Sequence, residues 1–349
     1  MTERARGGLA GMVLAAGLGT RLRPLTDRIP KPAVPVAGLP LVRYALARLA
    51  SAGVRRAVVN THHLAGEMEA AARSAAAAAG VELAVSAEPV IAGTGGALRE
   101  ARRLLAGADA VVLWNGDVLF DVDLAAVADA HRRSGALATM VLAPMPAGAA
   151  YAAVEVDPGL AVRRIAGLGP GGTALAPLHF TGVHVLSPAI LEAVPAEPFA
   201  CDVNRHVYPP LLASGAVRGL VAGGYWNDLG TPRRYLQANL DVLAGRAGAP
   251  LPGADPAAGM SASLGPRILV APGASIEPGA ALAAPVLVAR GAVVRAGATV
   301  GPDAVLGEGS VVCAGAVVRR AVVWDGTEVE EGERLVEAVA AGALRVPAA

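Results

Sequence analysis

The hydrophobic pattern divides the chain into two parts with different periods. Up to about residue 245, short runs of consecutive apolar residues alternate with helix-length amphipathic segments. Continuous apolar runs of this length are typical of strands buried on both faces of a parallel sheet. We therefore predict strands at 11–16, 56–61, 81–86 and 110–115, further strands at 137–143, 151–157 and 179–186, and helices at 40–52, 95–106 and 232–244. The alternation predicts an α/β fold with a mostly parallel central sheet.

Beyond residue 266 the hydrophobic period becomes six. Nine aliphatic residues fall on one six-residue register, namely Val270, Ile276, Leu282, Val288, Val294, Val300, Leu306, Val312 and Val318. This repeat is typical of a small left-handed parallel β-helix, in which each aliphatic residue points into a triangular prism. A low-complexity linker is the alternative, but it has no reason to keep register. Gly, Ala, Pro and Ser dominate 246–266, so we predict a linker there between domains at 1–245 and 267–349.

Composition and charge narrow the class of protein. The 349 residues include 54% hydrophobic but only 3% aromatic side chains, and no apolar run approaches the roughly 20 residues of a membrane span. The formal charge of +1 predicts no general attraction to nucleic acid. The two cysteines lie far apart, which favours neither a disulfide framework nor a metal cluster. We expect a cytoplasmic protein that binds neither membrane nor nucleic acid.

The stretch "MVLAAGLGTRLRPLTDRIPKP" at 12–32 combines a strand, a glycine-rich loop and clustered cations. Gly17 and Gly19 in such a loop let backbone N–H groups approach a polyphosphate, although a plain tight turn is the alternative. Arg21 follows the loop, and Lys31 stands between two prolines that hold its backbone extended. These cations favour a phosphate site. For Arg23 and Arg28 we prefer an ordinary surface loop.

Two acidic positions are candidate metal ligands. Asp117 in "WNGD" follows a predicted buried strand and a glycine, so it is expected at the carboxyl edge of the sheet. A carboxylate there suits Mg²⁺, which completes its shell with water and phosphate oxygens. Asp228 in "YWNDLGTP" could be a second ligand, although as an isolated motif it is a turn. Asp121 is a weaker candidate, and Asp123 is expected to cap the helix that follows it.

Taken in order, "AAGLGTRLRPLT…PKP", "EPVIAGTGGAL", "NGD", "FTGVHVL" and "WNDLGTP" resemble the motifs of the sugar-1-phosphate nucleotidyltransferases, over residues 10 to 245. The terminal six-residue repeat is similar to the left-handed β-helix of several members, mannose-1-phosphate guanylyltransferases among them. The resemblance implies a Rossmann-like fold and the reaction of an NTP with a sugar 1-phosphate to give an NDP-sugar and pyrophosphate.

The resemblance also implies roles for particular residues. By position it makes Arg21, Lys31 and Asp117 catalytic, makes Asp117 and Asp228 the Mg²⁺ ligands, and assigns the nucleotide to Ala15, Ala16, Gly17, Gly19, Thr20, Glu88, Gly93 and Thr94. Thr181 and Gly182 are expected on the sugar side. Many members hold the sugar phosphate with a lysine that is absent here from 162–172. Arg163 or Arg164 is the candidate substitute, and only one face of that strand can point inward.

The choice of nucleotide and the rival functions follow from single residues. The Glu88 carboxylate could accept hydrogen bonds from guanine N1–H and its amino group, which favours GTP over UTP. The resemblance of the β-helix tail implies mannose 1-phosphate as the sugar, and the alternatives are UTP-dependent glucose-, N-acetylhexosamine- or N-acetylmuramate-1-phosphate uridylyltransferases. A hexapeptide acyltransferase is disfavoured because no histidine lies beyond residue 206. A non-catalytic regulatory subunit is the remaining alternative. We expect the β-helix to make a homo-oligomer and to take no direct part in the chemistry.

Overall fold

The computed structural model describes residues 8–146, 148 and 151–348. It divides into two compact units, one made of residues 1–17 with 42–224 and the other of residues 18–41 with 225–349. The segment after Gly17 thus belongs with the C-terminal part of the chain, whereas the expected boundary at 245 places it in the first domain.

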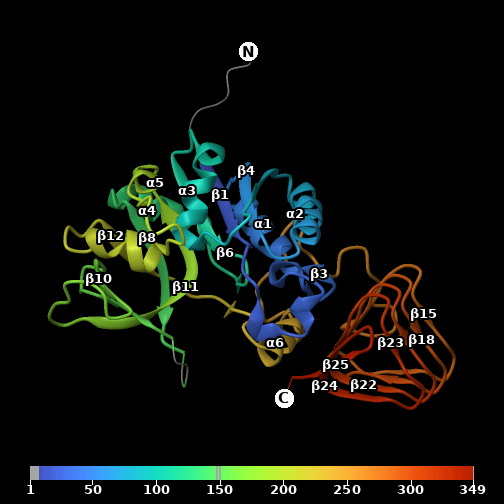
Figure 1. The fold of residues 1–349 in the computed structure, drawn as a ribbon. Coiled ribbons are helices and arrows are strands. Elements are labelled where there is room, and N and C mark those ends of the chain that lie inside the picture. The colour runs from blue at the N-terminus through green and yellow to red at the C-terminus, as the bar shows by residue number, and fades with distance from the viewer. Residues whose placement is uncertain (1–7, 147, 149–150, 349) are drawn as a thin grey trace. The chain divides into compact units, whose positions relative to one another are not determined.

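A nine-stranded mixed sheet forms the core of the first unit (Figure 1). Its strands are β1 (Leu9–Leu14), β4 (Arg56–Thr61), β5 (Glu82–Ala87), β6 (Ala110–Asn115), β8 (Ala138–Pro144), β9 (Ala153–Val156), β10 (Val162–Ile165), β11 (Ala176–Leu186) and β12 (Val217–Val221). The order β5-β4-β1-β6 is parallel throughout, and β11 joins β6 in antiparallel register. The mostly parallel central sheet is thus confirmed. Its strand order reverses between β1 and β6, which is where open α/β sheets bind ligands.

Helices cover this sheet and explain its apolar strands. They are α1 (Leu41–Ser51), α2 (Ala65–Ala79), α3 (Gly93–Leu105), α4 (Leu124–Ser134) and the short α5 (Ala189–Glu192), with β7 (Leu119–Phe120) between β6 and α4. Leu49 of α1 packs so closely on β1 that an added Cβ at Gly11 would lie 2.8 Å from its Cδ1. Asp123 caps α4 as expected, because its Oδ1 accepts a hydrogen bond of 3.0 Å from Ala126 N.

The second unit contains the loop after Gly17, one long helix and the repeat region. The loop makes three short 3₁₀ turns and the hairpin of β2 (Pro35–Val36) and β3 (Leu39–Pro40), and β13 (Trp226–Asn227) precedes α6 (Pro232–Leu243). Thr231 caps α6 through its side chain, and Pro232 occupies the first turn, where its missing N–H costs no hydrogen bond.

The repeat region consists of short parallel strands coiled into a β-helix. The strands are β14 (Ile268–Val270), β15 (Ser275–Ile276), β16 (Ala281–Leu282), β17 (Val286–Val288), β18 (Val293–Val294), β19 (Thr299–Val300), β20 (Ala304–Leu306), β21 (Val311–Val312), β22 (Val317–Val323), β23 (Glu328–Val329), β24 (Arg334–Ala341) and β25 (Leu344–Pro347). Equivalent strands of the first coils pair at a spacing of 18 residues, as Val270 with Val288. All nine residues of the predicted register belong to the interior cluster or pack on it.

The coil length changes once. Leu306 pairs with Val323, and Val312 with Val329, so the third coil is one residue shorter than those before it. The inward register therefore passes from Val318 to Val323. Trp324, which an unbroken six-residue register would point inward, instead follows the inward residue Val323. The antiparallel pairing of β24 with β25 ends the β-helix.

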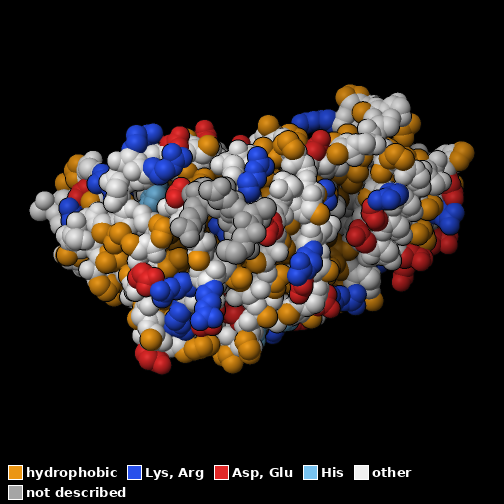
Figure 2. All heavy atoms as spheres, turned by 90° about the horizontal axis from the view of Figure 1, so that it is seen from above, with side chains coloured by type: hydrophobic (Ala, Val, Ile, Leu, Met, Phe, Trp, Pro, Cys, Tyr) orange, Lys and Arg blue, Asp and Glu red, His pale blue; other side chains and the backbone are white. Residues whose placement is uncertain are grey.

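On the face shown in Figure 2, basic and acidic side chains are interspersed, in keeping with the formal charge of +1. Within the described residues, the helices are all too short or too polar to span a bilayer.

Candidate active site

The glycine-rich loop folds tightly around Lys31. Gly19 has a left-handed backbone with φ of 62°, and an added Cβ there would lie 2.9 Å from Thr26 Cγ2 and 3.2 Å from Lys31 Cβ. Thr26 is fully buried, and its hydroxyl donates to the Gly19 carbonyl over 2.9 Å. Only glycine fits at 19, because both the backbone angle and the close packing exclude a side chain.

Three of the expected residues converge in the second unit. The Lys31 side chain is buried, and its Nζ donates to the backbone carbonyl of Asp228 over 3.0 Å. Gly230 separates the other two, since an added Cβ there would lie 3.2 Å from both Arg21 Nη1 and Asp228 Oδ1. Lysine, arginine and aspartate thus come together from segments about 200 residues apart. The exposed Arg21 and Thr20 lie on the outer side of this cluster.

A residue that sequence reasoning missed holds Asp228. The Asp228 carboxylate Oδ1 forms an ion pair of 2.5 Å with Arg234 Nη1 and accepts from Gly230 N over 3.2 Å. Arg234 lies on α6, three residues after the capping Thr231. The sequence signal for this pairing was a basic residue in the first turn of a helix that follows the segment containing Asp228.

The nucleotide-side residues of the first unit are joined by a chain of buried hydrogen bonds. Ala15 N, after β1, donates to Asn60 Oδ1 over 2.7 Å. Asn60 Nδ2, at the end of β4, donates to Glu88 Oε1 over 2.7 Å, and Ala92 N, before α3, donates to Glu88 Oε2 over 2.9 Å. Asn60 and Glu88 are 3% and 5% exposed. This chain fixes three loops at the carboxyl edge of the sheet.

The chain of hydrogen bonds changes the role expected of Glu88. Both of its carboxylate oxygens accept hydrogen bonds from the protein, and the side chain is buried, so in this structure it holds the loops rather than presenting an edge to a base. Asn60, which the sequence analysis did not single out, is its partner. Its place at the carboxyl end of a buried strand was the signal that could have found it.

The "GTGG" glycines pack against another segment of the same unit. Gly95 N and Gly96 N donate to the Cys201 carbonyl over 2.7 and 3.1 Å, and an added Cβ at Gly93 would lie 2.6 Å from that oxygen. The Thr94 hydroxyl donates to Asp202 Oδ2 over 3.2 Å and accepts from Val203 N over 2.8 Å. These residues join the start of α3 to residues 201–203, a contact that the motif did not predict.

The expected metal ligand Asp117 and the sugar-side pair lie on neighbouring strands. Asp117 follows β6, and Gly116 N donates to Leu14 O over 2.9 Å, so the ends of β6 and β1 are adjacent. Gly182 has φ of 89°, and an added Cβ would lie 3.1 Å from Asn115 Cβ. Thr181 is fully buried and its hydroxyl donates to Val141 O over 2.8 Å, so this hydroxyl secures β11 to β8.

The arginines considered for the sugar phosphate already have acidic partners. Arg164 Nη1 lies 3.0 Å from Glu155 Oε2, and Arg163 Nη2 lies 2.7 Å from Asp157 Oδ2. The Arg163 guanidinium lowers the pKa of the Asp157 carboxyl. Both arginines sit on β10, which β9 separates from β11 in the sheet. The other weak candidate, Asp121, pairs with Arg48 over 2.6 Å.

The donor set suits a hard cation with few protein ligands. Among the described residues, no three His, Cys, Asp or Glu side chains gather into a metal-binding group. Zinc sites generally need three or four such ligands, whereas Mg²⁺ takes one or two carboxylates with water and phosphate oxygens. Asp117 lies in the first unit and Asp228 in the second. Both cysteines are free thiols.

Comparisons with known proteins identify the family of the chain. A protein-family model described as nucleotidyl transferase matches residues 10–245. The mannose-1-phosphate guanylyltransferase of Mycobacterium tuberculosis is 33% identical over 241 residues, which cover 68% of this chain and 66% of the relative. The UTP–glucose-1-phosphate uridylyltransferase of Synechocystis is 30% identical over 249 residues, which cover 68% of this chain and 64% of the relative.

A third relative shows the same pattern. The mannose-1-phosphate guanyltransferase of Debaryomyces hansenii is 28% identical over 245 residues, which cover 67% of this chain and 65% of the relative. The chain spans slightly less than two thirds of the length of each of these relatives. With the family match over most of the chain, the motifs in their order and the strand arrangement β5-β4-β1-β6, the chain belongs to the nucleotidyl transferase family.

Proposed function

We propose that this protein transfers a nucleotidyl group from an NTP to a sugar 1-phosphate, releasing pyrophosphate, and that GTP and mannose 1-phosphate are its substrates. The observation that carries the proposal is the cluster of Lys31, Arg21 and Asp228, in which a buried ammonium lies 3.0 Å from the Asp228 carbonyl beside an exposed guanidinium. The relatives named as guanylyltransferases support the choice of GTP, whereas the uridylyltransferase of Synechocystis keeps UTP as the second candidate.

The mechanism follows from the charges that have to meet. A sugar phosphate oxygen attacks the α-phosphorus of the NTP, and two anions approach each other only when positive charge offsets their repulsion. Lys31 and Arg21 supply fixed positive charge where the pyrophosphate leaves. The attacking phosphate is already ionised near neutral pH, so the protein needs no general base. Its main contribution is to orient the two substrates.

We propose Mg²⁺ as the metal, with Asp117 and Asp228 as its carboxylate ligands. When bound, the ion would neutralise phosphate charge and orient the α-phosphate. The Arg234 ion pair fixes the direction of the Asp228 carboxylate. The Glu88 and Asn60 pair would hold the nucleotide loops of Ala15, Ala16 and Gly17 in place, and Gly17 is exposed, with open space where a side chain would be.

Two further properties belong to the proposal. We propose that the β-helix mediates homo-oligomer formation. Its first strand, β14, pairs with β17 over three residues on one side, whereas one isolated bridge, Ser261 with Val270, is its pairing on the other side in the described residues, and an incompletely paired edge can join a second copy. Light scattering of the full chain tests this, and a monomer would refute it. A cytoplasmic location is supported by the two free thiols, since reducing compartments preserve them.

The function is tested by following pyrophosphate release. The full chain is incubated with Mg²⁺ and each NTP against the 1-phosphates of mannose, glucose, N-acetylglucosamine and N-acetylmuramic acid. We expect the fastest release with GTP and mannose 1-phosphate, and none from Asp117→Asn, which loses a ligand charge without losing volume. Faster release with UTP on every sugar would refute the choice of nucleotide. Release with no pair at all would refute the activity and favour a regulatory subunit of the same fold.

A further inference from the structure

Helix α6 carries the attachment points of the loop that contains Lys31. The Tyr235 hydroxyl donates to the Pro35 carbonyl over 2.5 Å, and Asn239 Oδ1 accepts from Ala37 N over 2.7 Å. Asn239 Nδ2 in turn donates to the Tyr235 carbonyl over 2.9 Å, so the Asn239 side chain is itself held by the backbone of the same helix. Pro35 and Ala37 follow Lys31 by four and six residues, and α6 therefore fixes the chain on the exit side of the lysine.

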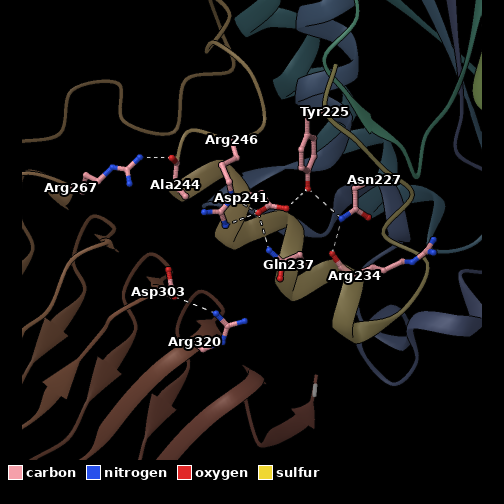
Figure 3. A network of polar contacts seen from close by, with 10 residues as sticks. All are labelled: Tyr225, Asn227, Arg234, Gln237, Asp241, Ala244, Arg246, Arg267, Asp303 and Arg320. Atoms are coloured by element: carbon pink, nitrogen blue, oxygen red, sulfur yellow. Dashed lines mark hydrogen bonds and ion pairs between the residues drawn. The ribbon is translucent and has the colours of Figure 1, made fainter. Parts of the chain in front are cut away.

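The same helix holds the segment that contains Asp228 (Figure 3). The Tyr225 hydroxyl donates to Asp241 Oδ2 over 2.9 Å, and Asn227 Nδ2 donates to the Arg234 carbonyl over 3.2 Å. The Arg234 side chain pairs with Asp228 itself over 2.5 Å. A shift of α6 would thus move the Lys31 loop and the Asp228 segment at once.

One residue of the β-helix reaches this helix in an unusual way. At the positions equivalent to Trp324, the earlier coils carry Ala271, Ala289 and Gly307, all small. Trp324 is 6% exposed and packs edge-on against Tyr235, with ring centroids 6.5 Å apart and planes at 82°. Its Nε1 donates to the Tyr235 hydroxyl over 2.9 Å. A single large side chain thus replaces a small one where the coil meets α6.

The hydrogen bonds run in one direction. Indole N–H can only donate, so the Tyr235 oxygen accepts from Trp324 and uses its own proton for the Pro35 carbonyl. Tyr235 has no exposed surface, and burial raises the pKa of its hydroxyl, which therefore keeps that proton. The chain Trp324–Tyr235–Pro35 is complete only when all three partners are in place, and a lost partner of the Tyr235 hydroxyl is costly because Tyr235 and Trp324 are both buried.

A second contact joins the same two parts. The turn between β24 and β25 brings Gly342 against the loop, since an added Cβ would lie 2.6 Å from Arg28 Nη1. Arg28 thus lies against the last turn of the β-helix, a neighbour that the expected surface loop did not include. The end of the β-helix touches the loop directly at Arg28 and indirectly through α6.

We propose that Trp324 is a positioning residue for nucleotidyl transfer: through Tyr235 it fixes the segment after Lys31, so that the β-helix sets the rate of turnover without touching a substrate. The inference rests on the proposed function of the Lys31 cluster. It agrees with the expectation that the β-helix takes no direct part in the chemistry, but it makes the β-helix necessary for full activity.

The test compares full-length variants that each lose one buried hydrogen bond. Trp324→Phe removes the indole donor, and Tyr235→Phe removes the hydroxyl with little change of shape. Tyr208→Phe is the matched control, because the Tyr208 side chain is also fully buried and its hydroxyl lies 2.8 Å from His184 Nδ1, outside the site. Turnover, KM for both substrates, and amide hydrogen exchange of the peptide covering 31–40 are measured for each.

We expect Trp324→Phe and Tyr235→Phe each to lower kcat about 10-fold with KM within about 2-fold, the pattern of a catalytic group held slightly out of place. The double variant should be no slower than the worse single one, since both changes break one chain. Exchange in 31–40 should rise in both single variants and stay unchanged in Tyr208→Phe.

Two results would overturn the proposal. The first is wild-type kcat with unchanged exchange of 31–40 in Tyr235→Phe, the variant least disturbing to packing. The second is an equal loss of kcat in Tyr208→Phe, which would reduce the effect to general stability. If the wild-type chain released no pyrophosphate with any substrate pair, the proposed function would fail, while the exchange measurement would still decide whether Trp324 controls the Lys31 segment.

Discussion

Exchanging the amide and the carboxylate between positions 60 and 88 tests the buried chain of hydrogen bonds at the nucleotide loops. In Glu88→Gln the side chain keeps one acceptor and gains a donor, yet it still faces two donors, Asn60 Nδ2 and Ala92 N. Asn60 cannot adapt by turning its amide, because its Oδ1 already accepts from Ala15 N over 2.7 Å. Whichever way the new amide at position 88 is turned, its NH₂ group therefore faces another N–H donor.

The size of the effect follows from the burial. Asn60 and Glu88 are 3% and 5% exposed, so water cannot relieve the conflict, and we expect Glu88→Gln to lower the free energy of unfolding by about 1–3 kcal/mol. Asn60→Asp places a second carboxylate against Glu88 and should cost about 3–5 kcal/mol, as an uncompensated buried charge does. A domain in the upper part of the ordinary range of about 5–15 kcal/mol survives either change.

The double variant, Asn60→Asp with Glu88→Gln, should be rescued. The new carboxylate at position 60 can accept from Ala15 N and from the new amide group at position 88. The amide oxygen at position 88 accepts from Ala92 N, so every donor regains an acceptor and the net charge is unchanged. We expect its free energy of unfolding within about 1 kcal/mol of the wild type, which makes the coupling between the two changes several kcal/mol. Urea unfolding of the four proteins measures this directly.

Additive losses in that cycle would refute the reasoning. The same four proteins also separate two roles of Glu88. If the Glu88 carboxylate holds the loops, Glu88→Gln should raise KM for all NTPs alike, and adding Asn60→Asp should restore KM. A carboxylate that binds guanine predicts a loss confined to GTP, which the second substitution cannot repair.

Three further predictions concern single side chains. Lys31→Ala should lower kcat about 10²-fold in the pyrophosphate assay, whereas Arg23→Ala, which removes an exposed arginine paired with Asp27, should leave it unchanged; equal effects would remove Lys31 from the site. Burial lowers the pKa of His184 to about 3, so only the unfolded chain takes up a proton at this residue as the pH falls below about 6.5. Between pH 6.5 and 4 this group should lower the free energy of unfolding by up to about 1.4 kcal/mol per pH unit. The contribution should be absent from the pH dependence of His184→Gln. Asp123→Ala should cost about 1 kcal/mol of stability in thermal unfolding through the lost α4 cap, and a change below about 0.3 kcal/mol would contradict the capping assignment.

The parts of the fold that the sequence predicted are those in which local pattern and tertiary environment agree. Strands β1, β4 and β6 are buried on both faces over most of their length, so their apolar runs are nearly continuous. Their bounds, and those of the half-buried strand β5 at the end of the sheet order, lie within two residues of the expected ones. The six-residue repeat is equally local, because each coil repeats the same inward contact. The shortened third coil could not be foreseen, since the loss of one residue after Val318 ends the register without a turn signal.

The site residues divide along a different line. Arg21, Lys31, Asp117 and Asp228 stand in loops of unusual composition, where glycine, proline and charge are visible in the sequence. Asn60 and Arg234 were missed because each acts on a partner far along the chain or across a turn, and an asparagine at a strand end has many ordinary uses.

Glu88 shows why the chemistry of a side chain does not fix its direction. The sequence shows that the Glu88 carboxylate can accept two hydrogen bonds. In the structure two donors of the protein, Asn60 Nδ2 and Ala92 N, use this capacity, because the end of β4 and the start of α3 meet there. Buried N–H groups are nearly always paired with an acceptor.

In the second unit, the position of the loop that contains Lys31 depends on the C-terminal region. The Pro35 carbonyl and the Ala37 amide of the Lys31 loop both form hydrogen bonds with side chains of α6. A helix that presents Tyr235 and Asn239 to a loop on one side needs a firm surface on the other, or the hydrogen bonds would average over several positions. The β-helix is such a surface, because its strands pair along the whole stack and its interior is closely packed aliphatic side chains. The repeat region therefore limits the movement of the Lys31 loop, and it does so through the hydrogen bond that Trp324 donates to Tyr235.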